Sequence, residues 1–150
     1  MDGNSGGPVI RGSCLCGGVR FEIARAAGPF ELCHCSKCRK TSGSAYRAGL
    51  MVEAKDFRLV EGKELIRTFE AAVVEAPPAY RQCFCERCGC PVPIPARAGD
   101  WFVPAGLLDD DPDIRPDKHI YVEFKAPWDT ITGPLPQMTK QQIAAERAGS

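Results

Sequence analysis

The sequence lacks an excess of charge of either sign and lacks any long hydrophobic run. Its 150 residues include 19 Lys and Arg against 19 Asp and Glu, so the formal net charge is +0 at pH 7. Because nucleic acids are bound through clustered cations, this balance argues against a nucleic-acid partner. No segment approaches the roughly 18 apolar residues of a membrane span. The first ten residues lack the basic start and apolar stretch of a signal peptide. We therefore expect a cytoplasmic protein with no membrane partner.

Long helical patterns are also scarce, because 15 Gly and 13 Pro interrupt the chain with turn signals. Short runs in which apolar and polar residues alternate predict strands instead. These runs are 19–23, 45–52, 57–60, 65–70, 80–84, 101–103 and 119–124. Weak helical signals cover only 36–42 and 137–148. The pattern predicts a mainly β fold in a single domain, with 75–78 as an internal loop. A flexible lead is expected at 1–10 and a C-terminal tail or short helix at 139–150.

Cysteine is the residue type present in excess. There are nine, and they fall into three groups in the sequence, at 14–16, 33–38 and 83–90. An odd number of cysteines without a secretory signal fits a disulfide framework poorly. Thiols two or three positions apart are badly placed to bridge each other but well placed to bind one soft metal ion together. The spacing therefore predicts zinc binding.

The nine thiols divide into two candidate zinc sites. Cys14 and Cys16 supply two ligands, and the Cys85-x-x-Cys88-Gly spacing supplies two more, which closes a structural site. The remaining group supplies three thiolates and leaves the fourth position open, as in a catalytic zinc site: Cys33, Cys35 and Cys38. In the alternative, Cys83 or Cys90 fills that fourth position and makes this site structural as well.

Other residues near these cysteines have simpler interpretations. His34 lies between two ligands and is predicted to point away from the metal, and His119 is predicted to be a packed or surface histidine. Trp101 and Trp128 are predicted to be core or pocket-wall aromatics. Three nearby cations are either anchors for substrate carboxylates or a solvated basic face: Arg39, Lys40 and Arg47.

Several motifs together resemble one known family. The segments GSCLCGGVRF at 12–21, CHCSKCRKTSG at 33–43 and FCERCG at 84–89 resemble three successive motifs of the glutathione-dependent formaldehyde-activating enzymes. This family also includes centromere protein V. Later blocks are similar too, namely AGLLDD at 105–110, HIYV at 119–122 and KAPW at 125–128. The resemblance covers 11–138, which we take as the zinc-binding domain.

The resemblance implies a β-tent-type zinc fold built from several curled antiparallel sheets. It implies that Cys14, Cys16, Cys85 and Cys88 hold a structural zinc and that Cys33, Cys35 and Cys38 hold the zinc of the active site, giving two zinc ions per chain. The implied activity is that of a carbon–sulfur lyase. Such an enzyme forms or cleaves the adduct between glutathione, or a similar thiol, and an aldehyde such as formaldehyde. The alternative from another class is a non-catalytic zinc module for protein or nucleic-acid contact.

Overall fold

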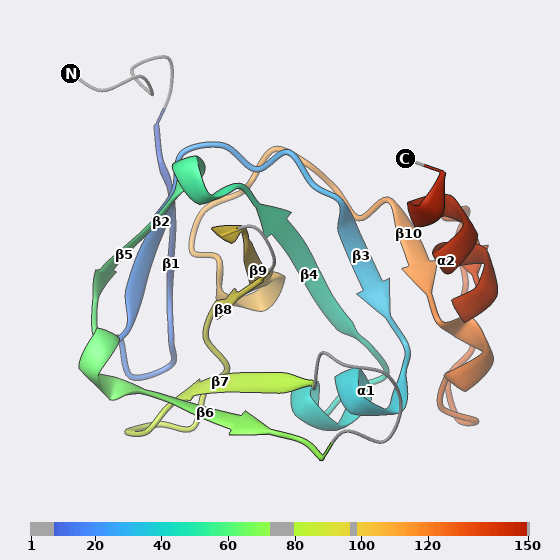
Figure 1. The fold of residues 1–150 in the computed structure, drawn as a ribbon, viewed down its shortest axis with the longest axis horizontal. Coiled ribbons are helices and arrows are strands. Elements are labelled where there is room, and N and C mark those ends of the chain that lie inside the picture. The colour runs from blue at the N-terminus through green and yellow to red at the C-terminus, as the bar shows by residue number, and fades with distance from the viewer. Residues whose placement is uncertain (1–7, 73–79, 97–98, 150) are drawn as a thin grey trace. The chain divides into compact units, whose positions relative to one another are not determined.

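The computed structural model describes residues 8–72, 80–96 and 99–149. The chain forms two compact units, each assembled from two stretches of sequence (Figure 1). The first unit contains Met1–Gly28 and Leu50–Ile114, and the second contains Pro29–Gly49 and Arg115–Ser150. The loop predicted at 75–78 and most of the lead predicted at 1–10 lie outside the described residues.

The first unit is built from short antiparallel strands. Its three-stranded sheet has the order β1-β2-β5, and β6 pairs with β7 while β8 pairs with β9. The strands are β1 (Ile10–Ser13), β2 (Arg20–Ile23), β5 (Phe57–Glu61), β6 (Ile66–Glu70), β7 (Arg81–Cys85), β8 (Ile94–Pro95) and β9 (Trp101–Pro104). Short 3-10 turns connect them, at η1 (Ala54–Asp56), η2 (Lys63–Leu65) and η4 (Ala105–Leu107).

The core of the first unit follows from the alternation along these strands. In β2, Phe21 and Ile23 are buried while Arg20 is exposed, as the period of two requires. Phe57 stacks on Phe21 at 5.7 Å and on Trp101 at 4.2 Å between ring centroids. A second buried group contains three of the cysteines together with aliphatic side chains: Cys14, Val19, Cys83, Cys85, Val92 and Ile94.

The second unit contains both α-helices of the described chain and the parallel strand pairs. In it, β10 lies between β3 and β11 and pairs parallel with each of them. The elements are β3 (Phe30–Cys33), α1 (Ser36–Ser42), the start of β4 (Arg47–Val52), β10 (Lys118–Ile120), η5 (Val122–Phe124), β11 (Gln137–Met138) and α2 (Lys140–Ala148). These parallel pairs depart from the antiparallel pairing that we expected throughout.

Helix α2 is held on the second unit at its beginning and near its end. Thr139 caps the helix by accepting a hydrogen bond from the Gln142 amide, and the Gln142 side chain accepts one from the Thr139 amide. Ile143 is buried, and Arg147 donates to the Glu31 carboxylate at 2.7 Å. The helix is therefore fixed to β3, the strand that leads into the second group of cysteines.

The mainly β prediction is confirmed, since β1 to β11 far outnumber the two α-helices of the described residues. One predicted strand is too long. The run 119–124 was expected to be a strand throughout, but β10 ends at Ile120. Tyr121 then adopts the left-handed conformation, with φ 57°, and the chain turns into η5. None of the described helices is both long and apolar enough to cross a bilayer.

Candidate metal centres

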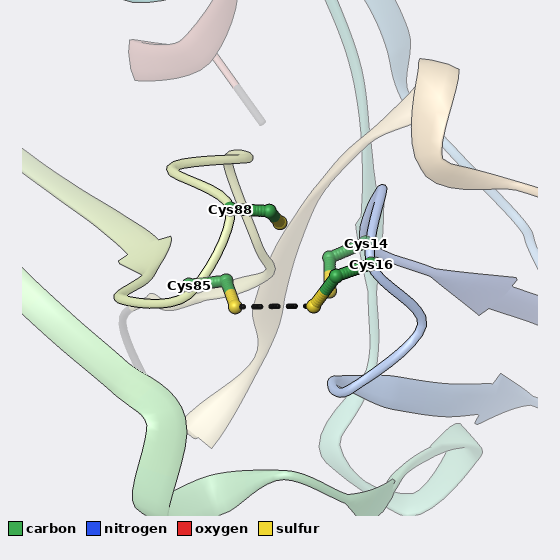
Figure 2. Close-up of side chains that lie close together, drawn as sticks. All are labelled: Cys14, Cys16, Cys85 and Cys88. Carbon is green, nitrogen blue, oxygen red and sulfur yellow. Dashed lines mark hydrogen bonds between the residues drawn. The ribbon is translucent and has the colours of Figure 1, made fainter.

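The first candidate centre is the four-cysteine set, made of Cys14, Cys16, Cys85 and Cys88 in the first unit. Cys14 and Cys16 lie in the turn between β1 and β2, and Cys85 ends β7. Figure 2 shows the two pairs facing each other, and all four sulfurs lie within 4.8 Å of one another. The Sγ of Cys16 lies 3.6 Å from that of Cys14 and 3.8 Å from that of Cys85. A tetrahedral zinc ion with Zn–S bonds of about 2.3 Å would separate its sulfurs by about 3.8 Å, so this set fits zinc.

Backbone amides of the turn point at the sulfurs of this set. The Val19 amide donates to Cys14 Sγ at 3.3 Å, and the Gly18 amide donates to Cys16 Sγ at 3.4 Å. Such donors stabilise a thiolate, which is the form that binds a metal. The turn closes because the Gly17 amide donates to the Cys14 carbonyl at 3.0 Å, with Gly17 at φ 78°.

Local hydrogen bonds and desolvation shift the pKa values of three thiols of the four-cysteine set. A hydrogen bond from the Cys90 amide lowers the pKa of Cys88 to about 6. The Gly18 amide favours ionisation of Cys16, but desolvation and hydrogen bonds with the neighbouring thiols outweigh it and raise its pKa to about 11. Burial opposes ionisation of Cys14, yet the Val19 amide and Cys16 still leave its pKa lowered. A metal ion binding here would displace the remaining protons.

The second candidate centre is the three-cysteine set, made of Cys33, Cys35 and Cys38 in the second unit. Cys33 ends β3, Cys35 is the N-cap of α1, and Cys38 lies in the first turn of that helix. Their sulfurs also lie within 4.8 Å of one another. The sulfur of Cys35 accepts from the Cys38 amide at 3.4 Å, as the oxygen of a serine cap would. The start of α1 therefore brings the three thiols together.

The thiols of the three-cysteine set shift one another's pKa values in opposite directions. Hydrogen bonds from the thiols of Cys33 and Cys38 lower the pKa of Cys35 strongly. The corresponding hydrogen bonds raise the pKa of Cys33, and burial adds to that effect. For Cys38, the hydrogen bond with Cys33 favours ionisation, but Cys35 and burial outweigh it and raise the pKa. Metal binding requires these cysteines as thiolates, so their protons would be released when an ion binds.

Two histidines pack together beside the three-cysteine set. His34 is fully buried and His119 is 7 % exposed, and Nε2 of His34 lies 2.8 Å from Nδ1 of His119. Burial lowers the pKa of both rings. Neither belongs to the donor set among the described residues, and the burial of His119 confirms the prediction that this histidine is packed. Sequence reasoning missed their contact with each other, because nothing in one sequence links positions 34 and 119.

The two cysteines outside both donor sets and the tryptophan at position 128 complete the residues singled out from the sequence. Cys83 is buried in the first unit, with its Sγ 3.4 Å from Thr68 Oγ1, and burial raises the pKa of Cys90. Within the described chain, neither of these cysteines belongs to a donor set. Trp128 was predicted to lie in the core or in a pocket wall, and its 71 % exposure in a loop shows that the core alternative is wrong.

The three candidate anchors differ in burial. Arg39 and Arg47 are half-buried, whereas Lys40 is exposed. The charge of Arg47 favours ionisation of Cys38, and that of Arg39 acts on His34. Nε of Arg39 is buried and has no hydrogen-bond partner among the described residues. Arg47 therefore acts electrostatically on one cysteine of the three-cysteine set, and Arg39 acts on the histidine that lies between the other two.

Comparison with known proteins identifies the family of this chain. The family model for the glutathione-dependent formaldehyde-activating enzyme matches residues 9–124, which include both sets. A protein of Halomonas elongata named "Putative glutathione-dependent formaldehyde-activating enzyme" is 32 % identical over 125 residues, covering 80 % of this chain and 79 % of its own. A crystal structure of a Rhodobacter sphaeroides protein matches the fold with a TM-score of 0.53 at 19 % identity, covering 85 % of this chain and 98 % of that one. The chain therefore belongs to the family of glutathione-dependent formaldehyde-activating enzymes.

Proposed function

We propose that this protein is a zinc-dependent carbon–sulfur lyase that forms or cleaves the adduct between a thiol such as glutathione and an aldehyde such as formaldehyde. The observation that carries the proposal is the three-cysteine set. Its three sulfurs converge within 4.8 Å, and no fourth His, Cys, Asp or Glu joins them among the described residues. Three protein ligands with an open position are typical of catalytic zinc, and the family membership supports the same chemistry.

The two centres have different roles in this proposal. Cys14, Cys16, Cys85 and Cys88 would hold a structural zinc, since four protein ligands leave no position for substrate. Cys33, Cys35 and Cys38 would hold the second zinc. When bound, that ion supplies a positive centre that lowers the pKa of a coordinated substrate thiol.

The reaction needs no oxidant or reductant. The sulfur of the thiol forms a bond to the aldehyde carbon, the carbonyl π bond opens, and the proton lost by the thiol ends on the new hydroxyl. In the reverse direction the carbon–sulfur bond breaks and the proton returns to sulfur. The protein therefore has to hold a thiolate in place and leave its sulfur accessible to the aldehyde.

Cationic side chains near the three-cysteine set suit an anionic thiol. Glutathione carries two carboxylates, and a guanidinium can bind a carboxylate through two parallel hydrogen bonds. The half-buried Arg39 and Arg47 are our candidates for this contact, and the exposed Lys40 is the weaker one. The buried Nε of Arg39 supports the assignment, because it is a donor without a hydrogen-bond partner in the described part of the chain.

The test is exchange between formaldehyde and glutathione, which also react without a catalyst. Zinc-loaded protein should accelerate this exchange above the uncatalysed rate, as measured by magnetisation-transfer NMR. Cys35→Ser should lose the acceleration. Cys83→Ser is the matched control, because this buried cysteine lies in neither donor set, and it should keep the acceleration. If the unaltered protein accelerates the exchange of no thiol and aldehyde pair, the non-catalytic zinc module becomes the better interpretation.

A further inference from the structure

We propose that the buried pair His34 and His119, together with Asp129, positions Cys33 and Cys35 for metal binding. The proposal rests on the proposed function, because it requires a metal ion at the three-cysteine set. It assigns a role to histidines that are not themselves in the donor set. All three residues belong to the second unit.

His34 is fixed to β10 through both its backbone and its side chain. Its amide donates to the Ile120 carbonyl at 3.0 Å, and its Nε2 lies 2.8 Å from Nδ1 of His119. Its ring also packs against Tyr46, with 5.2 Å between centroids. Because the side chain is fully buried, any change of rotamer would have to displace these neighbours.

The position of His34 in the chain connects this packing to the sulfurs. Successive side chains of an extended backbone point to opposite faces, so Cys33 and Cys35 share one face while His34 occupies the other. Cys35 has φ −64° and ψ 157°, which is extended backbone. Fixing the imidazole therefore fixes the directions of the two thiols that flank it.

The hydrogen bond between the rings has a preferred direction. Nδ1 of His34 lies 3.9 Å from the Asp129 carboxylate and has no hydrogen-bond partner within the described residues. If His34 donated from Nε2, its Nδ1 lone pair would face that negative charge. If His119 donates from Nδ1, the proton of His34 sits on Nδ1 and faces Asp129 favourably. We therefore assign His119 as the donor and His34 as the acceptor.

This assignment selects the variants for the test. In His119→Asn the side-chain amide nitrogen lies near the place of Nδ1 and can still donate to His34. In His119→Leu the size is similar but the donor is lost, so a buried acceptor remains unsatisfied. Removing a partner that contacts a metal ligand typically reduces metal affinity 10- to 100-fold, and His119, which acts on the ligands only through His34, should have an effect at the lower end of this range.

The experiment is titration of the metal-free full chain with Co²⁺, followed by the thiolate-to-cobalt and d–d absorption bands. The unaltered protein should bind two Co²⁺ ions, and the four-cysteine set serves as the internal reference in each variant. His119→Leu should bind the second ion about 10-fold more weakly and with shifted d–d bands. His119→Asn should stay within about threefold of the unaltered affinity, because it keeps the donor.

A further variant keeps the test decisive if His119→Leu does not fold. Asp129→Leu removes the carboxylate from a side chain that is already 21 % exposed, and it should also weaken the second site. The proposal is overturned if a folded His119→Leu or Asp129→Leu protein binds the second ion with unaltered affinity and spectrum. It is overturned as well if His119→Asn loses affinity as much as His119→Leu. If the unaltered chain binds only one Co²⁺ ion, the proposed function itself fails, which is a separate result.

Discussion

Gly62 shows how closely one residue packs against the turn of the four-cysteine set. It has φ 94°, and a Cβ at this position would lie 2.1 Å from the Gly18 carbonyl oxygen and 2.7 Å from the Val19 Cα. Both are backbone atoms of the turn whose amides donate to the sulfurs of Cys14 and Cys16. A side chain at 62 would therefore displace those amide donors.

We predict that Gly62→Ala is much more destabilising than Gly133→Ala. Both glycines have φ 94°, but a Cβ at Gly133 would meet nothing within 4 Å. Gly133→Ala should therefore cost only the left-handed backbone penalty of about 1–2 kcal/mol. Gly62→Ala adds a clash with backbone and should also weaken zinc binding. Urea denaturation of the zinc-loaded proteins measures the difference, and equal midpoints for the two variants would contradict the prediction.

At the scale of elements, the alternating runs located β2, β5, β6, β7 and β9 to within two residues of each end. Two strands of at least four residues were not predicted. β1 contains Gly12 between two polar residues, so the sequence shows no clear alternation of apolar and polar side chains there. β3 does alternate, with Phe30 and Leu32 buried, but it runs directly into the cysteines, which dominated the interpretation of that segment.

The end of β10 could not be predicted for a different reason. Residues 119–124 are rich in β-forming side chains, and tyrosine rarely adopts the left-handed conformation. The tertiary environment imposes that conformation on Tyr121.

The candidate metal sites were easier to predict from the sequence, because two or three of the ligands in each group are neighbours in the chain. The contact between His34 and His119 spans 85 positions and needs the parallel pairing of β3 with β10.

The N-cap of α2 can be tested by substituting Thr139. Thr139→Val keeps the size and branching of the side chain but removes the oxygen that accepts from the Gln142 amide at 3.2 Å. Losing an N-cap costs about 1 kcal/mol, which for this chain length lowers Tm by about 2–4 °C. Thr139→Ser keeps the acceptor and should melt close to the unaltered protein. If the valine and serine variants melt together in differential scanning calorimetry, the cap contributes nothing measurable.

At the scale of the whole molecule, the two candidate zinc ions should contribute unequally to stability. The four-cysteine set joins Cys16 and Cys85, which are 69 positions apart, and Cys85 is fully buried. The three-cysteine set spans only 33–38 and is already shaped by the start of α1. A structural zinc can contribute about 10 kcal/mol or more of apparent folding free energy, comparable to the roughly 5–15 kcal/mol by which a whole domain is stable.

We therefore predict that Cys85→Ser is insoluble or largely unfolded, whereas Cys35→Ser folds and retains one zinc ion per chain. Serine is a poor zinc ligand, so each variant leaves one site incomplete. Circular dichroism and thermal melting, together with zinc counting on both purified proteins, make the comparison. Complete unfolding of Cys35→Ser would mean that the three-cysteine set is structural and that its catalytic assignment is wrong.

Because β3 pairs with a strand from the far end of the sequence, the two candidate metal sites are completed at different times during synthesis of the chain. All four ligands of the four-cysteine set have left the ribosome once Cys88 has emerged. Cys33, Cys35 and Cys38 emerge earlier, but His119, β10 and β11 follow only with residues 118–138. About eighty residues are therefore added after the three thiols before β10 and His119 emerge, which at about 5–20 residues per second takes roughly 4–16 seconds. During that interval their protection from oxidants and competing metals depends on the surrounding cell.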